Sequence, residues 1–216
     1  MAQQLKPEVD NALRAAALDV FATRGYALAT MAEIARAAGV STGNVYVYFE
    51  NKERLFHAVV DDEFVASFTK LMLRKVRALR GVPDIGALGP DAPYRVLSEE
   101  LLQFWIANRK RVVILLRGAA GTVHETFAEQ TVDRLVQLAL AYFAGVRPRP
   151  SAVMRYVLRD IYKNFVSAMV GVLATYDDEK RIREATEIFT DYHLAGLKNV
   201  FAIPARTLAE SDEKAS

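Results

Sequence analysis

The side chains best suited to chemistry lie in a short segment, residues 42–52, where hydroxyl, amide and small side chains alternate with apolar ones. If Ser41 caps a helix that begins at Thr42, a step of about 100° per residue turns Val45 and Phe49 to the same side. The opposite side then carries a glycine, an amide, a tyrosine and a valine: Gly43, Asn44, Tyr46 and Val47. Such a face suits a helix that lies in the major groove of duplex DNA.

Each residue of this face is predicted to meet a different part of a duplex. Asn44 can pair with an adenine edge, Val47 can touch a thymine methyl, and Gly43 permits close approach of the backbone. Hydroxyl and ammonium groups nearby, with the amides at the starts of two short helices, are predicted phosphate contacts. The predicted DNA-binding residues are Thr30, Met31, Thr42, Gly43, Asn44, Tyr46, Val47, Tyr48 and Lys52.

Two short helices on either side of Gly39-Val40-Ser41 are expected to position this face, an arrangement typical of a helix-turn-helix. The first follows the capping box Thr30-Met31-Ala32-Glu33, in which side chain and backbone satisfy each other's helix-end donors. A preceding amphipathic helix is expected to end at Gly25. A fourth helix is predicted to begin at Lys52 and to continue to about Arg80.

Helical spacing also dominates the rest of the chain, and no alternating strand pattern is evident. Breaks rich in proline and glycine are expected at 81–93 and 147–150. The further helices are predicted at Tyr94–Asn108, Arg111–Ala120, Val123–Gly145, Ala152–Thr175 and Asp178–Phe201. The chain is therefore predicted to be all-α, with about nine helices.

Composition argues against several other classes of protein. The 216 residues include no cysteine, which excludes disulfides, thiolate metal sites and cysteine nucleophiles. The three histidines are widely spaced, and no phosphate loop, nucleophile elbow or paired-carboxylate motif occurs, so neither a metal, a cofactor nor an enzyme is expected. No signal-peptide core and no run of about 20 apolar residues is present, which predicts a cytoplasmic protein.

Overall charge gives no support to nucleic-acid binding. The net charge is +2, and residues 1–60 carry six basic and six acidic side chains. A helical module that binds a ligand or a protein, without sequence-specific DNA binding, therefore remains an alternative. The salt dependence of duplex binding distinguishes this alternative from a DNA-binding protein, because contacts to phosphate make the affinity for DNA fall steeply as the salt concentration rises.

Leu13–Val60 closely resembles the DNA-binding domain of the TetR family of bacterial regulators. The resemblance is carried by Ala16-Ala17, Val20-Phe21, Arg24-Gly25-Tyr26, Thr30-Met31-x-Glu33-Ile34-Ala35, Ala38-Gly39-Val40-Ser41, Gly43-Asn44-Val45-Tyr46-x-Tyr48-Phe49 and Asn51-Lys52-Glu53-x-Leu55. Thr42, Asn44 and Val47 depart from the family's usual residues, and they stand at base-reading positions. The resemblance therefore implies the fold but leaves the operator sequence open.

The resemblance also implies an architecture and a mechanism. Members are two-fold dimers in which the last two long helices pair as a four-helix bundle, here Ala152–Thr175 and Asp178–Phe201. An apolar ligand in the C-terminal body moves helix 4, spreads the two heads and releases the operator, so most members are repressors. The expected domains are a three-helix DNA-binding head, 1–56, linked by helix 4 to a ligand-binding and dimerisation body, 57–216.

Several residues of the body are candidates for a ligand pocket or for ordinary core. The set comprises Phe104, Trp105, Arg117, His124, Phe127, Tyr142, Met154, Tyr162, Phe165 and Met169. Arg117, in an otherwise apolar segment, is expected to meet either an internal carboxylate or an anionic ligand. A stripe on the last helix is expected to face the partner or the chain's own core: Ile182, Ala185, Phe189, Tyr192, Gly196 and Val200.

Overall fold

The computed structural model describes residues 6–80, 82, 88–143 and 151–202, and this part of the chain is all-α. It contains ten α-helices and one π-helical turn, η2. In chain order these are α1 (Pro7–Leu28), α2 (Met31–Ala37), α3 (Thr42–Tyr48), α4 (Lys52–Val59), α5 (Asp62–Arg77), α6 (Pro93–Ala107), α7 (Arg109–Val113), η2 (Ile114–Gly118), α8 (Phe127–Phe143), α9 (Ala152–Thr175) and α10 (Glu179–Ala202).

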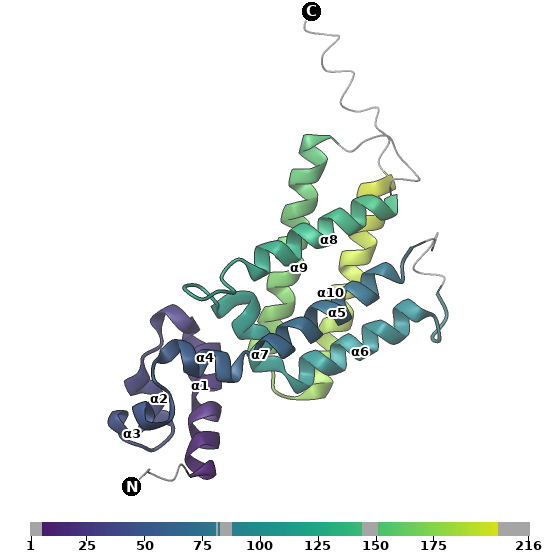
Figure 1. The fold of residues 1–216 in the computed structure, drawn as a ribbon. Helices are drawn as coiled ribbons and strands as arrows, with labels where there is room; N and C mark the ends of the chain where they lie inside the picture. Colours follow the sequence, from purple (N-terminus) through teal and green to yellow (C-terminus); the bar gives the residue numbers. More distant parts are fainter. Residues whose placement is uncertain (1–5, 81, 83–87, 144–150, 203–216) are drawn as a thin grey trace, which may run out of the picture.

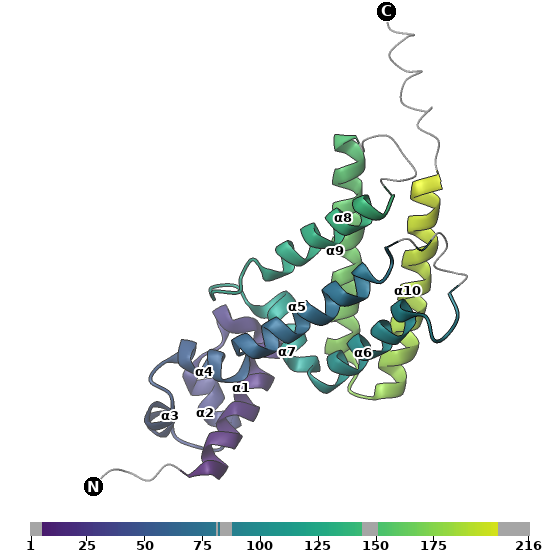
Figure 2. The same ribbon diagram turned by 45° about the vertical axis from the view of Figure 1, so that its right-hand side comes forward.

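The four N-terminal helices form a small head at one end of the molecule, and α5–α10 form a larger body (Figures 1 and 2). The head is held by apolar side chains that are completely buried, among them Leu13, Phe21, Ile34, Val45 and Leu55. The same cluster of buried side chains continues into α7, η2 and α9, so the head is anchored on the body by a shared core.

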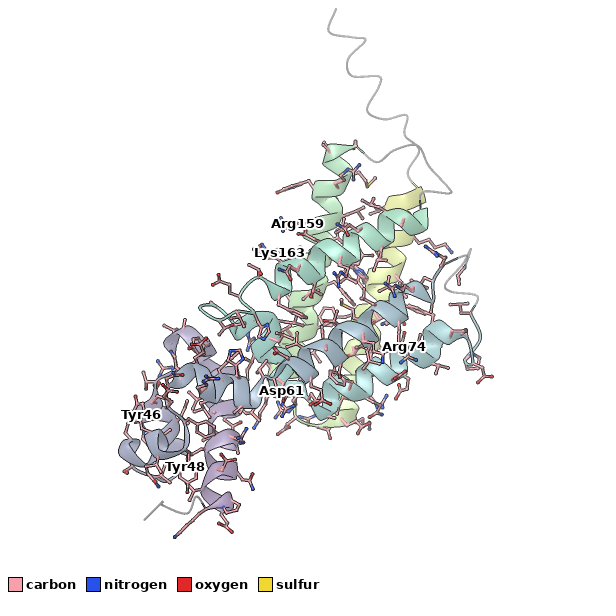
Figure 3. The ribbon with its side chains drawn as sticks, viewed as in Figure 1. Tyr46, Tyr48, Asp61, Arg74, Arg159 and Lys163 are labelled. Atoms are coloured by element: carbon pink, nitrogen blue, oxygen red, sulfur yellow. The ribbon has the colours of Figure 1, made fainter. Side chains whose placement is uncertain are left out.

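The predicted fourth helix is in fact two helices, which corrects the expectation of one helix from Lys52 to about Arg80. Val60 leaves the helical conformation at φ −122° and ψ 79°. The Asp61 carboxylate then accepts a hydrogen bond of 2.7 Å from the Phe64 amide and caps α5. Asp61 therefore marks a joint between head and body (Figure 3).

The middle of the body also differs from the predicted helix bounds. α7 begins at Arg109 and passes into the π-helical turn, which ends at Gly118. α8 begins at Phe127 rather than Val123, because a turn with Gly121 at φ +82° intervenes. The break at Gly25 is confirmed by its φ of +74°, although helical geometry resumes up to Leu28. The break predicted at 147–150 lies outside the described residues.

The long helices α9 and α10 pack side by side, with α8 across α9 and α5 against α6 (Figures 1 and 2). A second cluster of buried side chains joins α8, α9 and α10 around Val132, Leu158 and Leu197. Ile182 is fully buried in the chain's own core and Ala185 packs against it, so neither belongs to an exposed stripe on α10. None of the described helices is long and apolar enough to span a membrane.

Candidate nucleic-acid interface

α3 presents the outward face that the sequence predicts. The Ser41 hydroxyl accepts a hydrogen bond of 3.2 Å from the Asn44 amide and so caps the helix. Val45 is fully buried and Phe49 is 6% exposed, which holds the inner side of α3 against the head. On the outer side Tyr46 is 52% and Val47 is 42% exposed, and Tyr46 lies at the edge of the head away from the body (Figure 3).

The rest of the outer side of α3 is small and polar. Thr42 and Gly43 are exposed and Asn44 is half-buried. A β-carbon on Gly43 would meet no neighbour within 4 Å, so this end of the helix is open for close approach. The predicted base-reading residues therefore share one accessible surface, which we call the α3 surface: Thr42, Gly43, Asn44, Tyr46 and Val47.

α2 is fixed by the predicted capping box. The Glu33 amide donates to the Thr30 hydroxyl at 3.2 Å, and the Glu33 carboxylate accepts from the Thr30 amide at 3.0 Å. The same carboxylate accepts from the Thr30 hydroxyl at 2.9 Å. That bond first, then the one from the Thr30 amide and the nearby Arg24 guanidinium, hold the pKa of the Glu33 carboxyl below its usual range. Met31 has a buried side chain, so only its backbone amide is suited to contact phosphate.

Two predicted phosphate contacts are already engaged within the head. The Lys52 ammonium donates to the carbonyls of Tyr26 at 2.8 Å and Ala29 at 2.9 Å. It also lies 4.3 Å from the Tyr26 ring centroid. The Tyr48 hydroxyl accepts from the Lys6 amide at 3.0 Å. Lys52 therefore acts first as a cap for the end of α1, which the sequence did not reveal because its acceptors are 23 and 26 residues away.

One cation on the head was missed by sequence reasoning. Arg36, in the last turn of α2, is exposed and makes no side-chain hydrogen bond or salt bridge with a described residue. Its exposure beside the turn between α2 and α3 adds positive charge near the α3 surface, despite the neutral balance of the head.

The predicted ligand residues of the body fall into two separate groups. In the first group, the ring centroids of Phe104 and Phe64 are 5.5 Å apart. The ring centroid of Phe68 lies 6.4 Å from that of Trp105 and 5.7 Å from that of Phe127. His124 reaches back toward the head, where its ring is 6.3 Å from that of His57, and burial lowers its pKa. The Trp105 Nε1 and His124 Nε2 atoms are buried without a partner among the described residues.

The second group surrounds His193 of α10. The Phe165 ring stacks on His193 at 4.0 Å, and the Tyr162 ring meets it edge-on at 5.0 Å. Met169 is buried in α9, and Met154 packs beside the second core cluster. The side chain of Tyr142 lies outside the described residues.

Arg117 forms no internal salt bridge within the described part of the chain, which corrects that expectation, while contact with an anionic ligand stays a prediction. Its side chain is exposed and, within the described part of the chain, makes no ion pair or hydrogen bond. The reason is geometric. Gly118, the next residue, packs so closely on α1 that a β-carbon added to it would lie 3.3 Å from the Cα of Gly25. This side of η2 therefore faces α1, and Arg117 points outward.

The described residues include no cluster of three potential metal ligands.

A capped two-helix unit with an exposed second helix defines a helix-turn-helix DNA-binding protein. Residues 13–59 match the family model described as bacterial regulatory proteins, tetR family. A curated relative is the uncharacterized HTH-type transcriptional regulator YfiR of Bacillus subtilis (strain 168), which is 26% identical over 92% of this chain and 91% of its own. Residues 13–59 thus form a helix-turn-helix domain of the type found in bacterial tetR regulatory proteins, and over most of its length the chain is similar to a DNA-binding transcriptional regulator.

Solved structures of the same description are also similar. A TetR-like transcriptional regulator from Rhodococcus sp. RHA1 is 23% identical, with 92% of this chain and 96% of that chain covered and a TM-score of 0.41. The TetR family regulator PfmR from Thermus thermophilus is 19% identical, with 91% and 96% covered and a TM-score of 0.46.

Proposed function

We propose that this regulator is a homodimeric repressor that binds a two-fold symmetric operator and is released by a small apolar or amphipathic ligand. In this proposal residues 1–56 form the DNA-binding domain, and residues 57–216 bind the ligand and hold the dimer together. The observation that carries the first part is the α3 surface, since an exposed Gly-Asn-x-Tyr-Val face on a capped helix matches the groove-reading element of a helix-turn-helix.

Within the α3 surface we assign base recognition to Asn44 and Val47, and phosphate contact to Thr42 and Tyr46. The Asn44 amide offers a donor and an acceptor in the arrangement that an adenine edge requires. Gly43 lets the backbone approach, and the amides that start α2 and α3, with the hydroxyl of Tyr48, contribute further phosphate contacts. The Thr30 hydroxyl contributes only if it releases the Glu33 carboxylate, to which it donates at 2.9 Å. Lys52 supports them indirectly by holding the end of α1.

The test is to map the binding site in DNA upstream of the regulator's own gene and its neighbours, and then to titrate variants by gel shift. Asn44→Ala should relax the preference at one base position by about 1–3 kcal/mol. Tyr46→Ala should weaken binding to all sequences alike, with a smaller dependence on salt. Gln137→Ala, an exposed amide on α8, is the control. Unchanged affinity and unchanged base preference in both head variants would refute the assignment.

The dimer is supported by the outer sides of α9 and α10. These sides expose large apolar side chains that a monomer would leave in water: Val153 (63%), Tyr156 (74%), Ile188 (63%), Phe189 (39%) and Tyr192 (78%). They recur at helical spacing on two helices that lie side by side, and a second copy related by a two-fold axis would cover both.

Analytical ultracentrifugation tests this interface. Tyr192→Glu should shift the protein toward monomer, because it places a charge in the proposed apolar interface. Val123→Glu introduces the same charge at another exposed apolar position, 66% exposed, in the turn before α8, and should leave the assembly unchanged. A wild-type protein that sediments as a monomer at micromolar concentration contradicts the proposal.

A further inference from the structure

Lys75 is a cation on the buried side of an amphipathic helix. α5 turns Phe64, Phe68 and Met72 into the core, and Lys75 follows Met72 at the spacing that continues the same stripe. Its ammonium lies 5.4 Å from the ring centroid of the buried Tyr94. The Lys75 side chain as a whole is half-buried, and no carboxylate among the described residues pairs with its ammonium, although a charge withdrawn from water normally requires a partner.

The acidic side chains of the neighbouring helix are used elsewhere. Glu99 and Glu100 of α6 are exposed and pair with Arg183 and Arg74 respectively. Arg74 lies at the outer side of the α5–α6 pair (Figure 3). Lys75, one residue on, is half-buried and lies over the Tyr94 ring. Arg74, one of the outward cations of α5, is thus neutralised, whereas Lys75 has no carboxylate partner among the described residues.

The titratable groups near Lys75 on the other helices carry no charge at neutral pH: Tyr94, whose ring it contacts, His193, and Tyr162, whose ring contacts that of His193. Burial, with a smaller effect from the charge on Lys75, lowers the pKa of His193 on α10 to about 4. Burial raises the pKa of Tyr94 on α6 and of Tyr162 on α9 above the usual range. Burial also lowers the pKa of Lys75 to about 8, so at pH 7 it remains the charged member of this group.

The geometry points to Lys75 as the anchor for the acid group of an anionic amphipathic ligand, with Tyr94, Tyr162 and His193 as neutral partners around it. This inference rests on the proposed ligand-binding role of the body. The remainder of such a ligand is apolar or aromatic, because the same side of α5 continues into Phe68, which is bordered by Trp105 and Phe127. A neutral or cationic ligand would leave the ammonium without a counter-charge.

A matched pair of fluorescent probes separates charge from shape. 1-Anilinonaphthalene-8-sulfonate and N-phenyl-1-naphthylamine share one aromatic skeleton and differ in the sulfonate. With the full-length protein at pH 7, the anionic probe should bind at least about tenfold more tightly than the neutral one, as expected for one charge-assisted contact. Lys75→Met should abolish this preference and leave the neutral probe bound, whereas Lys75→Arg should keep it.

Lys70→Met, which removes an exposed cation from the same helix, is the control and should change neither affinity. A second readout needs no variant: between pH 7 and pH 9.5 Lys75 loses its charge, so wild-type affinity for the anionic probe should fall about tenfold while the neutral probe is unaffected.

Wild-type protein that binds neither probe, or binds both equally at pH 7, overturns the inference, as does a charge preference that survives Lys75→Met. Binding of the neutral probe without a charge preference would leave the ligand-responsive body intact and refute only the role of Lys75. The DNA and dimer experiments above do not depend on this residue.

Discussion

Replacing Lys75 by methionine should make the ligand-free protein more stable at neutral pH. Methionine fills a similar volume with a flexible apolar chain, so the substitution removes a partly desolvated charge with little change in packing. A residue kept for ligand binding at a cost to the fold is expected to behave in this way, and one kept for structure is not.

The size of the effect follows from the proton affinity of the ammonium. Its pKa falls from 10.5 to about 8 on folding. Each tenfold change in proton affinity corresponds to about 1.4 kcal/mol, so the charged Lys75 lowers the free energy of unfolding by at most about 3 kcal/mol. Loss of the contact with the Tyr94 ring offsets about 0.5–1 kcal/mol. We expect a net gain of about 1–2 kcal/mol at pH 7.

The gain should depend on pH in a defined direction. The folded pKa lies below the unfolded one, so between about pH 8 and pH 10 the unfolded chain binds the extra proton and the wild type becomes more stable as pH rises. Lys75→Met lacks this contribution, and its advantage should shrink toward pH 9.5. Above about pH 10 the raised pKa values of Tyr94 and Tyr162 begin to act in the opposite direction.

Urea unfolding at pH 7 and pH 9.5, at one fixed protein concentration, measures both quantities, since a dimer's stability depends on concentration. Lys70→Met is the matched control and should be neutral within about 0.5 kcal/mol at both pH values. A Lys75→Met protein that is less stable than wild type, by the same amount at both pH values, would refute the view of Lys75 as a desolvated cation.

Three further substitutions test the head and its attachment. Lys52→Met should lower the free energy of unfolding by about 1–3 kcal/mol, because two charge-assisted hydrogen bonds to the end of α1 are lost; full stability in urea would show that they do not matter. Gly118→Ala should cost about 1–3 kcal/mol, since its β-carbon would lie 3.2 Å from a carbonyl of α1; a melting temperature equal to wild type would contradict this. Thr30→Ala should cost about 1 kcal/mol and speed amide hydrogen exchange in α2 first; uniform acceleration across the head would argue against a local cap.

Local signals predicted the head well. Sequence alone predicts features that depend on residues within one helical turn. These include the capping box at Thr30, the cap at Ser41 and the inward direction of Val45. The same kind of signal was present at Asp61, which precedes a helix whose inner stripe starts at Phe64, but the continuous helical pattern around it concealed the joint.

Features that depend on distant contacts were not predictable in the same way. Arg117 lies in an apolar segment, yet its direction is decided by the close packing of Gly118 on α1, 93 residues away at Gly25. Lys75 was overlooked because a single charge on a long helix is usually solvated. Its surroundings come from α6, α9 and α10 and exist only in the folded body.

The attachment of the head limits how a change in the body can reach the DNA. Because α4 ends at Val59 and α5 begins at Asp62, a movement of α5 is not carried to the head by one continuous helix. One close contact between head and body is instead the packing of Gly25 on Gly118, supported by the ion pair between Asp19 and Lys110. A rigid rotation of the head must shift this contact, so in the proposed mechanism we expect η2 to take part in passing a change beside α5 to the head.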